Sequence, residues 1–169
     1  MDLPVWTRVS AYAVAVEDGR LLLARLSDAS PVFTPGLWHL PGGGIDPGEQ
    51  PVEALARELR EETGLELVAA RLLDARTYAV QRHGVDWHLT GLFYAVDLKA
   101  GAPVVRETDG STDAAVWTPL ADLHDSMLSP AAADALRTLQ SRSDSFRHPH
   151  VGAVGESPNH EACGEKLYR

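Results

Sequence analysis

The sequence predicts an α/β (α+β) sandwich in which strands flank one long helix. The helix is predicted over residues 49–63, where apolar side chains recur at helical spacing, and Gly64 follows as its C-terminal cap. Segments rich in β-branched and aromatic residues lie on both sides of it, at residues 5–26 and 65–98. A chain of 169 residues is long enough for one domain with a hydrophobic core and too short for two ordinary ones.

The part before the helix is predicted to contain a hairpin and a further short strand. Glu17-Asp18-Gly19 is a turn signal between two apolar runs, and Pro41 with the glycines after it ends the third run. The expected elements are a strand at 5–16, a turn at 17–19, a strand at 20–26, a loop at 27–36 and a short strand at 37–40.

The part after the helix continues with strands and ends in a helix. The expected elements are strands at 65–80 and 86–98 joined by a turn at His83-Gly84, a polar loop at 101–113, a strand at 115–118, and helices near 120–123 and at 130–139. Residues 141–169 are rich in Ser, His, Gly and Pro. We therefore expect a domain over residues 1–140 and an extended or peripheral tail over 141–169.

The composition limits the classes of partner. The formal charge is −9 and the pI is near 5.1, so a general affinity for nucleic acid is not expected. Cys163 is the single cysteine, which excludes an intramolecular disulfide. No apolar run approaches the roughly 20 residues that span a bilayer, and the first residues do not resemble a secretory signal. We expect a cytoplasmic protein with no membrane partner.

Two glutamates of the predicted helix share one face. At about 100° per residue, the expected buried stripe consists of Val52, Leu55, Ala56 and Leu59. Glu58 and Glu62 are four residues apart, so one lies above the other, and Glu62 falls at the border of the stripe. Glu61 lies further round, toward solvent.

Like charges at this spacing repel, and a hard cation such as Mg²⁺ or Mn²⁺ reverses the sign of that interaction. The glycines at 42–44, just before the helix, let the backbone approach closely and offer carbonyls or amides. The ordinary alternative is a solvated helix face with ion pairs such as Glu53–Arg57 and Arg57–Glu61. The fixed spacing of the glycines and glutamates decides between them and favours a metal-binding or phosphate-binding site.

This spacing resembles the Nudix box, in which Gly, five residues, Glu, seven residues and Arg-Glu-U-x-Glu-Glu-x-Gly-U recur, with U a bulky aliphatic residue. The matching residues are Gly43, Glu49, Arg57, Glu58, Leu59, Glu61, Glu62, Gly64 and Leu65. The order of strands and the Trp-containing segment at 115–118 extend the resemblance to about residues 5–139. It implies an α/β/α sandwich around a mixed β-sheet, with the box forming loop, helix and loop.

The resemblance also implies roles for the box residues. Glu58 and Glu62 match the metal ligands of the family, and Glu61 contributes in many members. The carbonyl of Gly42 or Gly43 commonly joins them, and the cation is Mg²⁺ or Mn²⁺. Arg57 resembles the arginine that orients the carboxylates and is counted among the catalytic residues. Two further box residues are structural: Glu49 is the partner of Arg57, and Gly64 ends the helix.

The implied reaction is hydrolysis of a diphosphate linkage in a nucleoside diphosphate joined to another group. The base that takes the proton of water differs between members: it is Glu61 or a carboxylate of a later loop. Glu107 is the loop candidate, with Asp109 and Asp113 behind it, and solvated loop residues are the alternative for all three. Arg25 is a candidate phosphate ligand.

Other residues are weaker candidates. Phe33, Trp38 and Tyr78 are aromatic residues that could stack on a base, although core packing is the better expectation for Trp38 and Tyr78. The tail residues His148, His150, His160 and Cys163 follow no compact zinc pattern, so we interpret them as tail composition.

The substrate is the part that the resemblance leaves open. Markers of the ADP-ribose, diadenosine polyphosphate, NADH and coenzyme A groups are missing, which favours a nucleoside triphosphate or modified nucleotide by elimination. An ADP-ribose or nucleotide-sugar pyrophosphatase is the alternative. A non-catalytic nucleotide sensor would usually have lost box glutamates, and an isopentenyl diphosphate isomerase needs a cysteine inside the fold, whereas Cys163 is in the tail. A homodimer is common in the family, and the oligomeric state stays open.

Overall fold

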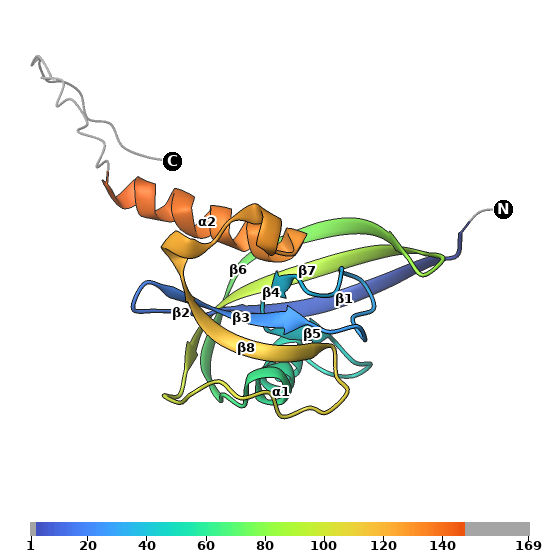
Figure 1. Ribbon diagram of the computed structural model, residues 1–169, viewed down its shortest axis with the longest axis horizontal. Coiled ribbons are helices and arrows are strands. Elements are labelled where there is room, and N and C mark those ends of the chain that lie inside the picture. The colour runs from blue at the N-terminus through green and yellow to red at the C-terminus, as the bar shows by residue number, and fades with distance from the viewer. Residues whose placement is uncertain (1–2, 148–169) are drawn as a thin grey trace, which may run out of the picture.

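The computed structural model describes residues 3–147, and the strands lie between two helices. Within this range the elements are β1 (Val5–Val14), β2 (Val16–Glu17), β3 (Arg20–Leu26), β4 (Trp38–His39), β5 (Gly42–Gly44), α1 (Pro51–Thr63), β6 (Leu67–Arg82), β7 (Val85–Leu98), β8 (Thr112–Pro119), the 3₁₀ helices η1 (Leu120–Asp122) and η2 (Asp125–Met127), and α2 (Pro130–Arg147). Figure 1 shows α1 on one side of the strands and α2 on the other. The expected α/β/α arrangement is confirmed.

The strands form two sheets. The first has the order β5-β1-β7-β6 and is mixed, because β1 pairs in parallel with β7 while the other neighbours are antiparallel. In the second, β3 pairs antiparallel with β2, β4 and β8. The strands are thus divided between a mixed and an antiparallel sheet. No helix in residues 3–147 is long and apolar enough to cross a membrane.

Strand β3 is buried on both faces, which explains its unbroken run of leucines. Leu21 and Leu23 belong to the core that includes Leu136 of α2. Leu22, whose side chain points the opposite way, belongs to the core that includes Leu55 of α1. The two cores hold the helices against opposite sides of the strands, and this fixes the position of α1.

Helix α1 begins and ends with the expected signals, although its buried face is rotated from the expected one. Pro51 opens the first turn, and Gly64 adopts φ 68° and donates its N–H to the carbonyl of Arg60. The buried arc is centred near Leu55 and Glu62, and Val52, in the first turn of the helix, is 42% exposed. The expected burial of Val52 was therefore wrong, and Glu62 lies inside the buried face rather than at its border.

The glycines at 42–44 form a strand, where the sequence indicated the end of one. They pair antiparallel with residues 10–12 of β1. Gly42 has φ 135°, and a Cβ there would overlap the carbonyl oxygen of Ala11, so only glycine fits. Glycine has a low β propensity, but pairing with β1 holds these three residues in a strand.

Two further boundaries differ from expectation. Strand β8 begins at Thr112, inside the expected loop. Helix α2 continues past residue 139 to Arg147, into the segment expected as tail. The boundary of the domain at residue 140 stays a prediction.

Candidate active site

The C-terminal half of α1 contacts β5 and the loop before β8. Glu62 is 2% exposed, and its carboxylate accepts hydrogen bonds from the N–H of Gly42 (2.8 Å) and the hydroxyl of Ser111 (3.2 Å). Glu58, one turn earlier, lies against Gly43, where an added Cβ would stand 2.5–2.9 Å from the carboxylate atoms. Both glutamates therefore face the glycine strand, as their four-residue spacing predicts.

Arg57 holds the acidic residues around it in place. Its guanidinium donates to both carboxylate oxygens of Glu49 (3.0 and 2.9 Å), to Glu58 (2.9 Å) and to the carbonyl of Gly44 (3.1 Å). Glu61 lies 3.5 Å away from it. The hydrogen bonds to Glu49 are the first cause that raises the pKa of Arg57 above its ordinary value. The structure thus shows the Arg57–Glu49 pairing that the resemblance implied.

The two glutamates facing β5 are held in surroundings that disfavour their charged form. Burial raises the pKa of Glu62 to about 8, with the carboxylates of Glu58 and Glu107 adding to the rise and the hydrogen bonds from Gly42 and Ser111 opposing it. Burial also raises the pKa of Glu58, although Arg57 acts against it. A cation between these carboxylates would remove the cost of ionising them.

The oxygen donors present suit a hard divalent cation. No group of three or more His, Cys, Asp or Glu side chains in residues 3–147 is arranged to hold a metal ion by itself. Glu58 and Glu62 would accordingly need further oxygens, such as those of backbone carbonyls and of a bound phosphate. The carbonyl of Gly44 accepts a hydrogen bond from Arg57, and those of Gly42 and Gly43 remain the candidates that the resemblance implied.

Of the loop carboxylates, Glu107 lies nearest the helix glutamates. Its backbone N–H donates to the carbonyl of Glu61 (3.1 Å), and its charge raises the pKa of Glu62. Asp109 lines a separate surface pocket, and Asp113 is paired with Arg25 at 2.7 Å. Asp113 lies in β8 rather than in the loop, and of the three carboxylate candidates only Glu107 is brought to the glutamates.

A cavity opens beside Glu62 between β1, β5 and the loop at 27–36. Its lining includes Arg8, Tyr12, Phe33, His39, Glu62 and Ser111. Phe33 was a sequence candidate, whereas Arg8, Tyr12 and His39 were missed. The alternation of β1 puts Arg8, Ser10 and Tyr12 on one face, but the sequence alone does not show that this face borders the glycine strand.

Arg8, which was not among the sequence candidates, lies at the cavity, whereas the candidate Arg25 does not. Arg8 lines the cavity and, among the described residues, makes no ion pair with a carboxylate; its Nε lies 3.4 Å from the hydroxyl of Ser10. Arg25 does not line this cavity, and its guanidinium is neutralised by Asp113. A phosphate-binding role for Arg25 stays a prediction, and Arg8 is the arginine placed beside the glutamates.

The other aromatic candidates belong to the core. Tyr78 packs against the α2-side core and donates its hydroxyl to Asp134 (2.8 Å). Trp38 packs against the same core. Core packing is therefore confirmed for both. The tail residues His148, His150, His160 and Cys163 lie outside the described residues.

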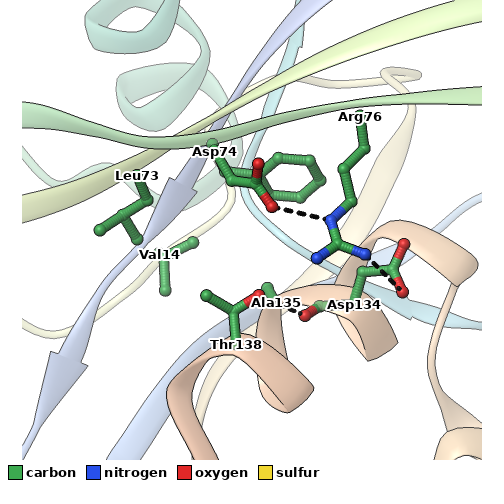
Figure 2. Close-up of a pocket in the computed structure, with 8 residues that line it drawn as sticks. Val14, Leu73, Asp74, Arg76, Asp134, Ala135 and Thr138 are labelled. Atoms are coloured by element: carbon green, nitrogen blue, oxygen red, sulfur yellow. Dashed lines mark hydrogen bonds and ion pairs between the residues drawn. The ribbon is translucent and has the colours of Figure 1, made fainter. Parts of the chain in front are cut away.

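A second cavity lies between β6 and α2, as Figure 2 shows. Arg76 on its rim is hydrogen-bonded to Asp74 (2.8 Å) and lies 3.5 Å from Asp134. Its charge is already balanced by these two carboxylates, so the cavity has no free cation to attract a phosphate. The first cavity differs from it, because Arg8 beside Glu62 has no carboxylate partner among residues 3–147.

The chain belongs to the NUDIX family: the family model for the NUDIX domain matches residues 6–139. A nucleoside triphosphatase, NudI of Escherichia coli O1:K1, is 49% identical over 55 residues, and this match covers 32% of the chain and 38% of that relative. A MutT NUDIX hydrolase from Burkholderia pseudomallei is similar in structure, with a TM-score of 0.65, 33% identity, and coverage of 79% of this chain and 98% of that one.

A second solved structure is also similar. The E. coli ORF135 protein has a TM-score of 0.61 at 26% identity, and the match covers 83% of this chain and 94% of that one. These similarities agree with the mixed sheet and two helices described above.

The Arg57 network leads to a first prediction. Arg57→Lys should lower the free energy of unfolding by about 1–3 kcal/mol, because a single ammonium cannot reach both oxygens of Glu49 together with Glu58 and the carbonyl of Gly44. Denaturant unfolding would measure the change. Arg60→Lys, at an exposed position of the same helix, is the matched control and should change stability by less than about 0.5 kcal/mol. Equal effects in the two variants would contradict the network's role.

Proposed function

We propose that the chain is a hydrolase that uses water to split a diphosphate linkage in a nucleoside diphosphate joined to another group. A nucleoside triphosphate or a modified nucleotide is the proposed substrate. The observation that carries the proposal is the pair Glu58 and Glu62, packed against the glycine strand. Glu62 also lines the cavity that holds Arg8, an arginine with no carboxylate partner among residues 3–147. The names of the relatives, a nucleoside triphosphatase and a MutT NUDIX hydrolase, support it.

The proposed cofactor is Mg²⁺ or Mn²⁺. Glu58 and Glu62 would hold it, with Glu61 and the carbonyl of Gly42 or Gly43 as the remaining protein ligands. When bound, such a cation neutralises phosphate charge and lowers the pKa of water. The buried carboxylates supply two negative charges in a place where water screens little, which favours a divalent ion strongly.

The residues of the chain would share the remaining work. Glu107 is the base that we assign, because Glu61 is held by Arg57 whereas Glu107 is exposed beside Glu62. It would take a proton from water as the water oxygen bonds to phosphorus and the bridging P–O bond breaks. Arg8 would bind the phosphates and offset charge as it develops. Arg57 would keep Glu58 in position.

The test is product analysis on a panel of compounds with Mg²⁺, with Mn²⁺ and with EDTA. The panel holds the nucleoside triphosphates, an oxidised purine triphosphate, ADP-ribose, a nucleotide sugar, NADH and a diadenosine polyphosphate. We expect metal-dependent cleavage of a triphosphate, abolished by EDTA.

Other outcomes would replace parts of the proposal. Preferred cleavage of ADP-ribose or of the nucleotide sugar would keep the hydrolase and change its substrate to that alternative. Binding of a nucleotide without cleavage of any compound would overturn the enzyme and favour a nucleotide sensor. Glu107→Gln separates the two candidate bases, because it should lose activity only if Glu107 rather than Glu61 takes the proton.

A further inference from the structure

The cavity beside Glu62 continues to a buried histidine between two aromatic rings. His39 lines it and is 4% exposed. Its ring centroid lies 4.7 Å from that of Tyr12 in an edge-to-face arrangement and 5.2 Å from that of Phe33 in a tilted one. The lining of this cavity therefore combines the carboxylate of Glu62 with an aromatic group that contains one polar ring.

The hydrogen bonds around His39 determine which ring nitrogen carries the proton. Nδ1 lies 2.6 Å from the hydroxyl oxygen of Ser129, a fully buried residue just before α2. That oxygen also accepts the N–H of Ala132 (3.2 Å). Of these two partners only Nδ1 can accept the hydroxyl proton, so Ser129 donates to Nδ1 and the proton of the neutral ring is on Nε2. Burial lowers the pKa of His39 to about 3, which keeps the ring neutral.

Nε2 opens onto the cavity. Among the described residues, the buried side-chain polar atoms that have no hydrogen-bond partner are Arg82 Nε and Thr112 Oγ1. Nε2 of His39 also has no hydrogen-bond partner among the described residues, but it is not one of these fully buried atoms. Part of Nε2 is therefore exposed, and it is exposed to the cavity that His39 lines. His39 thus presents to the cavity an N–H donor whose position on the ring is set by Ser129.

We propose that His39 is a specificity-determining residue whose Nε2–H donates a hydrogen bond to a carbonyl oxygen on the nucleobase of the substrate. This inference rests on the proposed function, because it takes the ligand to be a nucleotide with its phosphates at Glu58 and Glu62. Guanine, hypoxanthine, uracil and thymine carry a carbonyl where adenine and cytosine carry an amino group, which is a donor and would meet Nε2–H proton to proton. The enzyme therefore prefers the carbonyl-bearing bases.

The test compares two ligands that differ at one position of the base. Methylene-bridged, non-hydrolysable analogues of inosine triphosphate and of purine riboside triphosphate share every group except the carbonyl and its ring N–H. With Mg²⁺ present, titration calorimetry on the wild-type chain should show about 10-fold to 100-fold tighter binding of the inosine analogue. Equal affinities would overturn the inference without the need for any variant.

Variants then assign the preference to His39. His39→Phe keeps a ring between Tyr12 and Phe33 but has no donor, so the preference should disappear. Ser129→Ala frees Nδ1 to carry the proton and should weaken the preference, whereas Ser129→Thr retains the hydroxyl and should keep it. Trp6→Leu is the control: Trp6 is 53% exposed, lies on the same face of β1 as Arg8, and does not line the cavity.

The outcomes separate this inference from the proposed function. Loss of the preference in His39→Phe but not in Trp6→Leu supports the inference. Loss of the preference in Trp6→Leu alone would place the base outside the cavity and overturn the inference. A preference that is unchanged in His39→Phe would also overturn the inference. Absence of cleavage across the compound panel would sink the proposed hydrolase, while the binding preference is measured without cleavage, on analogues in which both bridging oxygens are replaced by methylene groups.

Discussion

Glu62→Gln should lower kcat by about 10²–10³-fold with Mg²⁺ at saturating concentration, while the chain stays folded. The variant retains the shape of the side chain: the amide oxygen can accept the N–H of Gly42, and the amide nitrogen can donate to Ser111. It removes one of the two charges proposed to hold the cation. The loss should therefore appear in the reaction rate and in metal affinity rather than in the fold.

Glu66→Gln is the matched control for this experiment. Glu66 lies just beyond α1, is exposed, and pairs with Lys99 at 3.2 Å on the surface. Such a pair contributes little, so neither rate nor stability should change appreciably. Rates would be measured at several Mg²⁺ concentrations in each variant. Full activity of Glu62→Gln at all of them would falsify the assignment of Glu62 to the cation.

The helix and its carboxylates could be predicted because their signals are local. The cap at Gly64 depends on backbone geometry within a few residues, and the shared face of Glu58 and Glu62 depends only on helical periodicity. The expected burial of Val52 failed for a different reason: whether the first turn of the helix is covered depends on what packs against that turn, and the sequence of the helix alone does not contain it.

The rest of the site depends on pairings between distant segments. His39 and Ser129 are 90 residues apart, and the proton on Nε2 follows from their hydrogen bond. Arg8 and Arg25 both lie on strands, and the sequence alone does not indicate which of them is the better candidate for binding a phosphate. Pairing of β3 with β8 brings Arg25 to Asp113, whereas pairing of β1 with β5 brings Arg8 to the glycine strand. Sheet topology decides between them.

The stability of the metal-free protein should fall as the pH rises from 6.5 to 8. Burial raises the pKa of Glu62 from 4.5 to about 8, so the folded chain keeps a proton that the unfolded chain has released. This contribution is complete below pH 4.5 and is lost as the pH approaches 8. His39 acts in the opposite direction, because burial lowers its pKa from 6.5 to about 3, and its contribution is complete above pH 6.5.

Above pH 6.5 the contribution of His39 to stability is therefore constant, and the change that remains between these two groups is that of Glu62. There the free energy of unfolding should drop by about 1–2 kcal/mol in EDTA, and thermal unfolding would show this as a decrease of a few degrees. Glu62→Gln has no proton to lose, so its stability should stay level and exceed that of the wild type at pH 8. Mg²⁺ should raise the melting temperature of the wild type more at pH 8 than at pH 6.5, because the proton competes with the cation for the same carboxylate. If the slope persists in Glu62→Gln and Mg²⁺ leaves both proteins unchanged, Glu62 is not the group that titrates in this window, and the metal site does not exist.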